Sequence, residues 1–232
     1  MLRAALVTCV SSLLLGATLP ARAELGDLGG TVSVQSDARE RGLSYSQDKP
    51  QAAATLSYDG SDGWYGGTLL TRARFDAGHH SDLTQFYAGR VVSLSNGLDF
   101  EAGLQYSRFP SISRYSFAEA YAGLLGARWN ARLHFASDYY GSGTRTAYAE
   151  YNTNWPLHND VQAVAHLGML LRAGGRDVAG GSARYDSRLG LAWQLRPIEL
   201  QLAWVAVSPG GPYTWVDERR RNALVLGVSA SF

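Results

Sequence analysis

Hydrophobic and polar residues alternate along most of this chain with a period of two. Between 127 and 135 every odd position is apolar and every even position is polar or charged. The last nine residues, 224–232, repeat the pattern with apolar residues at every even position. Successive side chains of a β-strand point to opposite faces, so this alternation predicts strands with one apolar and one polar face. No segment shows a helical period.

Twelve such segments follow one another from about residue 30 to the C-terminus. The connections after the even-numbered segments contain only one to five residues, whereas 39–49, 173–182 and 209–219, which follow odd-numbered segments, contain ten or eleven. The predicted strands cover about 30–38, 50–58, 64–75, 82–94, 98–106, 115–125, 127–135, 145–155, 161–172, 183–195, 198–206 and 224–232.

Long strands, an even strand count and short turns at one end are typical of a bacterial outer-membrane barrel. Such a sheet must close on itself, because hydrocarbon cannot satisfy the hydrogen-bonding groups of an open edge. An even count also returns both termini to the periplasmic side. The sequence therefore predicts an all-β fold, a closed antiparallel up-and-down transmembrane β-barrel of about 12 strands.

Alternation alone does not say which face points outward, and in a soluble β-barrel or sandwich the apolar rows point inward. The basic residues favour the membrane: of 21 lysines and arginines only Lys49 is a lysine, although a solvated surface normally carries many. Aromatic residues near the strand ends favour it too, because two aromatic girdles flank a lipid-facing band. The expected girdles are Tyr58, Tyr65, Trp129, Trp155, Trp193 and Phe232 near the short turns, and Phe75, Tyr106, Tyr139, Tyr185 and Trp204 near the longer loops.

The N-terminus has the features of a secretory signal peptide. Arg3 supplies a positive start, 4–15 form an apolar run, and 21–23 form a small-x-small pattern that predicts cleavage before Glu24. The run is too short for a membrane helix, and no later stretch approaches ~18 apolar residues. We therefore expect a signal peptide at 1–23, which holds the single cysteine, and a Gram-negative outer-membrane barrel at 24–232.

Composition narrows the function classes. A formal net charge of +1 without a basic stripe argues against nucleic-acid binding. A hydrophobic fraction of 46% argues against disorder. Phosphate loops, cysteine-rich sites and dinucleotide fingerprints are missing from the sequence, so no cofactor is expected. The expected partners are membrane lipids and lipopolysaccharide, small-molecule solutes and the outer-membrane assembly machinery.

One stretch carries a recognisable series of short motifs. They are Ser36-Asp37, Arg41-Gly42-Leu43-Ser44, Gln47-Asp48-Lys49-Pro50-Gln51, Tyr58 and Gly63-Trp64-Tyr65-Gly66-Gly67. In these residues the segment 36–75 resembles the TorF-family porins (the Gcw_chp family) of proteobacteria. Ala38 and Glu40 depart from the family, which usually carries aromatics there. The resemblance implies an outer-membrane barrel with a porin role, and it says more about location than about the solute.

If the apolar rows face lipid, the polar rows face the lumen. An eight-stranded barrel is filled by side chains and a sixteen-stranded one is open, so twelve strands fit either a narrow pore or a packed plug. Arginines in the lumen could guide anions by their permanent forked charge, or the mixed charges could pair and fill the barrel. The pore-lining candidates are Arg72, Arg74, Arg90, Glu101, Glu119, Arg128, Arg132, His134, Glu150, Arg188 and Glu199, with Asp99, Arg172 and Asp186 on the same faces.

The first long loop offers mouth candidates, namely Asp37, Arg41 and Gly42. The loop could fold into the mouth and place Arg41 as a constriction charge. Alternatively, Gly42 supplies a positive φ in a simple turn and Asp37 pairs with a nearby arginine. Both interpretations are open at this point.

The last long loop ends in Arg219-Arg220-Arg221 at the predicted outer rim. These arginines are candidates for contact with lipopolysaccharide phosphates, or they form a solvated loop end. Tyr213 and Trp215 either stack on a sugar or dock on headgroups.

Catalytic and metal sites fit the sequence less well. Ser137 lies on the opposite parity from His134, so these two cannot form a nucleophile–base pair on one strand, although a histidine from another strand remains open. His79 and His80 lie near Asp76 and Asp82, but adjacent histidines on a strand-end loop are usually solvated. No catalytic residue and no metal ligand is therefore predicted.

The leading interpretation is a non-enzymatic porin that lets small solutes diffuse passively, with a preference for anions. Two alternatives stay open: an outer-membrane lipid hydrolase or acyltransferase, and a plugged structural barrel.

Overall fold

The computed structural model describes residues 27–75, 78–95, 97–178, 180–213 and 220–232. The predicted signal peptide lies outside these residues. The wall strands are β1 (Asp27–Gln35), β4 (Gln51–Asp59), β5 (Trp64–Arg74), β6 (His80–Ser93), β7 (Asp99–Arg108), β8 (Phe117–Leu125), β9 (Trp129–Ala136), β10 (Thr144–His158), β11 (Val161–Gly175), β12 (Ala183–Leu195), β13 (Ile198–Val207) and β14 (Asn222–Ser231).

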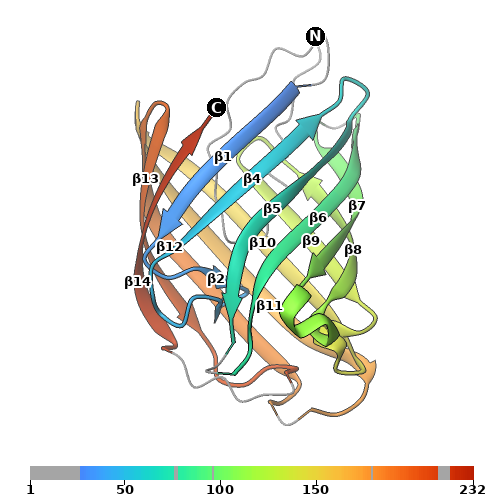
Figure 1. Ribbon diagram of the computed structural model, residues 1–232. Helices are drawn as coiled ribbons and strands as arrows, with labels where there is room; N and C mark the ends of the chain where they lie inside the picture. The colour runs from blue at the N-terminus through green and yellow to red at the C-terminus, as the bar shows by residue number, and fades with distance from the viewer. Residues whose placement is uncertain (1–26, 76–77, 96, 179, 214–219) are drawn as a thin grey trace.

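These twelve strands form one closed antiparallel barrel, which confirms the predicted fold class. Each strand pairs with its neighbour in sequence, and β1 closes the cylinder against β14, with Thr31 opposite Ser231 and Gln35 opposite Gly227. β1 begins and β14 ends at the same end of the barrel (Figure 1). We call this the turn end, because the short connections lie there, and the opposite end the loop end.

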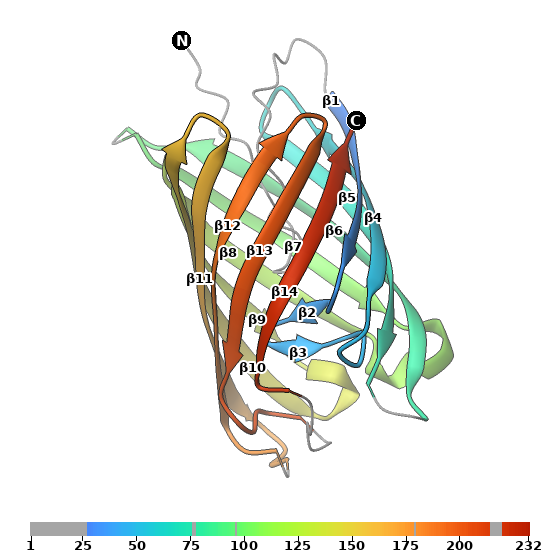
Figure 2. The same ribbon diagram turned by 90° about the vertical axis from the view of Figure 1, so that its left-hand side faces the viewer.

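The loop end carries the smaller elements. β2 (Arg39–Glu40) and β3 (Leu43–Ser44) pair as a two-stranded hairpin between β1 and β4, and they lie inside the barrel outline (Figure 2). Two 3₁₀ turns, η1 (Pro110–Tyr115) and η2 (Tyr139–Gly141), connect wall strands. In the described part of the chain, no helix is both long and apolar enough to cross a bilayer.

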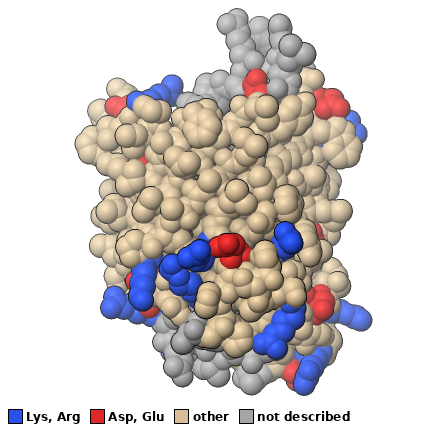
Figure 3. All heavy atoms as spheres, viewed as in Figure 1, with Lys and Arg blue, Asp and Glu red and all other residues tan. Residues whose placement is uncertain are grey.

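The apolar rows of the strands face outward. Leu104 on β7 and Leu189 on β12 are 66% and 64% exposed, whereas Glu101, inward on β7, is 0% exposed. Lys, Arg, Asp and Glu lie at the turn-end edge and over the loop-end half of the visible face, and they leave an almost uncharged band between these two regions (Figure 3). A water-soluble barrel would bury its apolar rows, so the soluble alternative is wrong.

The expected aromatic girdles are confirmed only in part. Tyr58, Trp193 and Trp204 are exposed on the outer wall, whereas Tyr65 lies inside, 6% exposed, because its odd position on β5 belongs to the inward row. Phe75 and Tyr139 follow the ends of β5 and β9 and turn into the loop end of the lumen.

The outward orientation predicts a depth-dependent cost for charge. Leu189→Arg, in the middle of β12, should destabilise the barrel in lipid by about 2–4 kcal/mol, because a lipid-facing arginine must lose water at the bilayer centre. Leu28→Arg is the matched control: Leu28 is 74% exposed at the turn end, and the same change near an interface should cost about 0–1 kcal/mol. Reversible denaturant unfolding from vesicles measures both, and equal costs would contradict the assignment.

Candidate functional site

The first long loop, 36–50, which we call the lumen loop, folds into the barrel. Its hairpin turn needs Gly42, whose φ is +72° and whose Cα lies so close to the wall that an added Cβ would be 2.5 Å from Val207 Cγ2. Arg184 Nη2 on β12 donates to the Gly42 carbonyl at 3.3 Å. Gly42 is therefore required both by backbone conformation and by close packing against β12 and β13.

Arg41 ties the hairpin to the opposite wall. Its Nη1 and Nη2 donate to the two carboxylate oxygens of Glu119 on β8 at 2.8 and 2.7 Å. The guanidinium carbon lies 4.4 Å from the ring centroid of Tyr148 and 5.7 Å from that of Tyr139. Both charged side chains are almost fully buried. A two-pronged arginine–carboxylate pair of this kind is directional as well as strong.

Arg39 organises the base of the same loop. Its guanidinium pairs with Asp37 and with Asp48, and its Nη1 donates to the backbone carbonyl of Arg220 at 2.8 Å. The hydroxyls of Ser44 and Ser46 donate to the second oxygen of Asp37. Both interpretations of this loop are therefore correct in part: Gly42 makes the turn and Asp37 pairs with an arginine, and the turn as a whole folds into the mouth.

An aromatic cluster packs around the lumen loop at the loop end. Phe75 lies edge-on to four rings, with centroid distances of 5.3–5.5 Å and interplanar angles of 60–81°. The hydroxyls of Tyr45 and Tyr140 bond to each other and connect the loop to η2. Burial of these rings stabilises the folded-in loop. The cluster comprises Tyr45, Phe75, Phe109, Tyr115, Phe117, Tyr139, Tyr140 and Tyr213.

Nearer the middle of the barrel, charged wall residues pair across strands. Arg132 on β9 binds Glu101 on β7 and lies 3.7 Å from Glu150 on β10, whose carboxylate also faces His134 at 3.4 Å. Beside this group, Tyr65 and Tyr121 share a hydroxyl contact of 2.7 Å. The paired network agrees with the alternative that mixed charges fill the lumen.

A second network lies on β10, β11 and β12. His166 Nε2 lies 2.8 Å from Asp186 Oδ1 and its Nδ1 lies 2.7 Å from Asn152 Oδ1. The Tyr148 hydroxyl donates to Asp186 at 3.3 Å. His166 and Tyr148 were not among the candidates, although their inward parity on β11 and β10 could have identified them. Arg184 was also missed, although its parity on β12 is the same as that of the candidates Asp186 and Arg188. Arg39 and Glu40 were missed because nothing local shows where a loop folds.

The structure separates the pore-lining candidates into two groups. Those that face the lumen are Glu101, Glu119, Arg132, His134, Glu150, Arg188 and Glu199, all 7% exposed or less.

For four arginines the pore-lining prediction is wrong, because their side chains do not face the lumen. Arg72 is outward and exposed, paired with Asp82 at 3.2 Å, and Arg74 shares its parity on β5. Arg90 is outward and lies over the Trp64 ring, and Arg128 is exposed in the turn before β9. The reason is depth: positions at strand ends lie beyond the apolar band, so charge there does not mark the lumen face. Among the candidates that do face the lumen, two arginines stand against four glutamates.

The remaining candidates lie at the rim or outside. Arg220 and Arg221 are exposed at the loop end, and Arg219 lies outside the described residues. His79 stacks on Tyr115 and contacts Arg114. Across the described residues, no group of three or more His, Cys, Asp or Glu is arranged to hold a metal ion. Asp76, which the sequence places near these histidines, lies outside the described residues.

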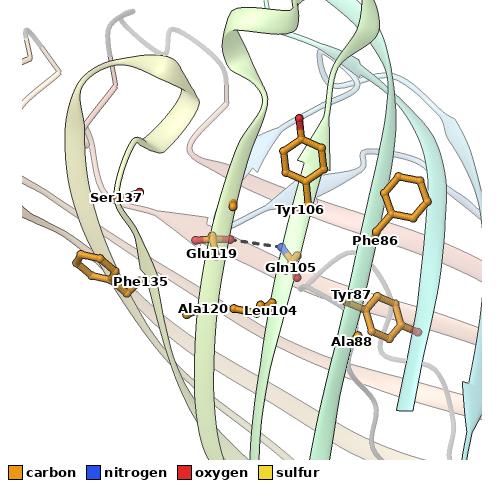
Figure 4. A pocket seen from close by; sticks show the side chains of 11 residues that line it. Phe86, Tyr87, Ala88, Leu104, Gln105, Tyr106, Glu119, Ala120, Phe135 and Ser137 are labelled. Atoms are coloured by element: carbon orange, nitrogen blue, oxygen red, sulfur yellow. Dashed lines mark hydrogen bonds between the residues drawn. The ribbon is translucent and has the colours of Figure 1, made fainter. Parts of the chain in front are cut away.

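The outer wall carries a groove of about 500 Å³ over β6–β9. Phe86, Tyr106 and Phe135 border it, and Ser137 lies at its edge (Figure 4). Ser137 is exposed on this outer face, whereas His134 is buried in the lumen. These two side chains therefore lie on opposite sides of the wall and cannot act together on a substrate.

The sequence of the whole barrel matches a known protein family. Residues 24–232 match the family described as "Bacterial protein of unknown function (Gcw_chp)". The chain belongs to the Gcw_chp family. The resemblance seen in the motifs at 36–75 is thereby confirmed and extends to the whole barrel. No curated protein matches the chain in sequence.

Several solved porins share the fold of this Gcw_chp protein. A KdgM porin in complex with disordered oligogalacturonate is 11% identical, with a TM-score of 0.56 over 90% of this chain and 99% of that one. A NanC porin is 12% identical, with a TM-score of 0.59 over 88% and 99%. An outer membrane channel from Pseudomonas putida F1 is 13% identical, with a TM-score of 0.51 over 90% and 96%. At these identities the likeness concerns the fold.

The electrostatics of Glu40 give a pH prediction. Burial raises the pKa of the Glu40 carboxyl from 4.5 to about 8; Arg41 opposes this rise, and Glu119, Glu150 and Asp186 add to it. Because the folded pKa exceeds the unfolded one, the protonated carboxyl favours the folded-in loop at low pH, and that contribution is lost as the pH rises toward about 8.

Glu40→Gln should remove this dependence. Between about pH 5 and pH 9 the melting temperature of the wild type should fall by a few degrees more than that of the variant. The difference between the two proteins at each pH cancels the other titrating groups. Parallel pH profiles would show that Glu40 is not the group responsible.

Proposed function

We propose that this protein is an outer-membrane channel for small solutes, in which the lumen loop forms the constriction. The N-terminal 23 residues would direct export, the turn end would face the periplasm and the loop end the outside. The observation that carries the proposal is the Arg41–Glu119 pair, which holds a folded-in loop across a closed, polar lumen. The shared fold with small porins supports the same function.

A plugged structural barrel is the second candidate, and the aromatic cluster favours it, because the rings pack closely around the loop. The two candidates differ in what happens when the loop is released. In a channel, loosening the constriction widens an existing path. In a structural barrel, the packed side chains stop ion flow regardless of the loop.

Conductance of purified protein in planar bilayers tests the proposal. Wild type should show small unitary steps, and Arg41→Ala should enlarge them severalfold, because the loop loses its tie to β8. Glu119→Gln should act similarly, and the double variant should add little, since both changes remove one interaction. Arg128→Ala, in an exposed turn, is the control. If neither wild type nor Arg41→Ala conducts, the barrel is structural.

The expected preference for anions is replaced by the opposite proposal. The lumen candidates carry an excess of carboxylates, and two of the inward arginines, Arg41 and Arg132, are already bound to Glu119 and Glu101. One similar porin is described in complex with disordered oligogalacturonate, but a polyanion needs unpaired positive charge along its path. We therefore propose that cations and uncharged solutes pass more readily than anions.

Reversal potentials in a potassium chloride gradient measure this preference. Glu199 lines the turn end and its partner is the Gln194 amide rather than an arginine, so Glu199→Gln should remove a negative charge without exposing a positive one. The variant should shift the reversal potential toward zero. Arg90→Gln changes a charge on the outer wall and should leave it unchanged. A reversal potential of anion-selective sign in the wild type would refute the proposal.

A further inference from the structure

The groove on the outer wall has a clear cause in the sequence. It has a volume of about 500 Å³ and lies over β6–β9, and we call it the wall groove. The outward positions of β8 that line it are alanines, Ala118 and Ala120. The register places Ala118 opposite Tyr106 of β7 and Ala120 opposite Phe135 of β9. Small side chains between large ones leave a hollow over β8, with Phe135 on one side and Tyr106 and Phe86 on the other (Figure 4).

The lining of the wall groove fits an acyl chain. Its outward side chains are alanines, Leu104 and aromatic residues, and Ser137 lies only at the edge. An acyl chain in the hollow touches wall atoms on several sides instead of one, and each contact adds dispersion attraction. This gain does not distinguish one lipid from another, because the tails of all lipids are equally apolar. Selection among lipids therefore requires a contact with the headgroup.

Two exposed arginines lie at the loop end of the wall groove. Arg108 follows Tyr106 by two residues in the same outward row of β7, about 7 Å further toward the loop end. Arg145 is exposed on β10, and the pairing of β10 with β9 places it across from Ser137 at the edge of the groove. The side chains of Arg108 and Arg145 form no ion pair or hydrogen bond with another described residue. Both guanidinium groups are therefore available to a ligand.

Positive charge exceeds negative charge at this end of the groove. The acidic residue beside it is Asp138, which follows Ser137 and accepts from the Gly143 backbone N–H at 2.7 Å. An arginine fork suits phosphate oxygens, because two parallel N–H groups match their geometry. Three strand spacings, about 14 Å, separate β7 from β10. Arg108 and Arg145 therefore suit a headgroup that carries two separate phosphates better than one that carries a single phosphate.

We propose that the wall groove binds one molecule of lipopolysaccharide, with an acyl chain over Ala118 and Ala120 and with the two phosphates of its lipid A headgroup on Arg108 and Arg145. This inference goes beyond the proposed function, because the groove lies outside the lumen and takes no part in conduction. From that proposal it uses only the orientation of the barrel, in which the loop end faces outside, where lipopolysaccharide forms the leaflet.

Other occupants fit this surface less well. A phospholipid supplies acyl chains but has one phosphate for two arginines. A second copy of this chain, joined through the same face by two-fold symmetry, would bring Arg108 and Arg145 toward the same arginines of its partner, which is an unfavourable contact between like charges.

The test is native mass spectrometry of the full, folded protein in detergent, titrated with three lipids. Diphosphoryl lipid A carries both phosphates, monophosphoryl lipid A has the same acyl chains and one phosphate, and phosphatidylglycerol represents phospholipids. One diphosphoryl lipid A should bind per barrel, at least about tenfold more tightly than either other lipid, as expected for one additional charge-assisted bond. Equal binding of monophosphoryl lipid A or phosphatidylglycerol, no binding of diphosphoryl lipid A, or a dimer that forms without lipid would overturn the proposal.

Variants separate the two parts of the site. Arg108→Gln and Arg145→Gln should each weaken binding of diphosphoryl lipid A by about tenfold. Arg90→Gln, which removes a charge from the outer wall at the turn end, is their control and should bind as wild type. Because the arginines alone could attract phosphate without any groove, unchanged affinity after the groove is filled would also overturn the proposal.

Ala120→Leu fills the groove and should weaken both forms of lipid A severalfold while it keeps the preference for the second phosphate. Ala165→Leu makes the same change on the outward row of β11, outside the groove, and should have no effect. Heat-modifiable gel migration verifies folding, and Ala118→Leu replaces Ala120→Leu if that variant does not fold.

Discussion

The structure depends on one constraint: no backbone hydrogen-bonding group of the wall can be left open on a face surrounded by apolar side chains. Pairing of β1 with β14 meets this constraint and closes the cylinder. Closure then divides every strand into an outward row, which must be apolar where it crosses the band, and an inward row, which need not be. The exposed Leu104 and the buried Glu101 on β7 are two results of the same requirement.

A closed cylinder of this size has an interior that its own wall side chains do not fill. The lumen loop fills the loop end, and its polar residues bring partners for the wall: Arg41 for Glu119, and the Gly42 carbonyl for Arg184. Inward glutamates without these partners would be buried charges with a high desolvation cost. The wall and the loop therefore specify each other, which explains why a segment of irregular backbone is held inside the closed barrel.

The sequence predicts the wall well because alternation is a local signal that repeats along each strand. All twelve strands and their antiparallel order could be derived from it. The outward apolar face needed two further signals, the scarcity of lysine and the aromatic residues near the strand ends. The lumen loop could not, because its contacts join residues far apart in the chain: Arg41 to Glu119 across 78 positions and Arg39 to the Arg220 carbonyl across 181. No local pattern records such contacts, and the turn chemistry of Gly42 is the same for a solvated turn as for a folded-in one.

The wrong prediction that some outward arginines line the pore has the same cause, because a local sequence pattern does not record contacts with other strands. Arg72 and Arg90 have the parity of their strand's outer face, whereas the prediction from sequence rests on the expectation that charge points inward. That expectation holds only within the apolar band. Near the strand ends water and headgroups are available on both faces, so a charge there carries no information about orientation. Register with a neighbouring strand, which pairs Arg90 with Trp64, supplies the missing information.

The two faces of the wall also differ in the free-energy cost of breaking a side-chain contact. On the outer face a broken contact leaves a group against hydrocarbon, which offers no replacement partner. In the lumen, a broken Arg41–Glu119 pair can be hydrated, so its loss costs the difference between a good ion pair and two solvated charges, which is far less than exposure to lipid. We therefore expect any rearrangement to involve the loop inside the barrel rather than the wall. A fold that cannot open its wall can still rearrange its interior, and the groups that would have to rearrange are those that the lumen loop brings to the wall.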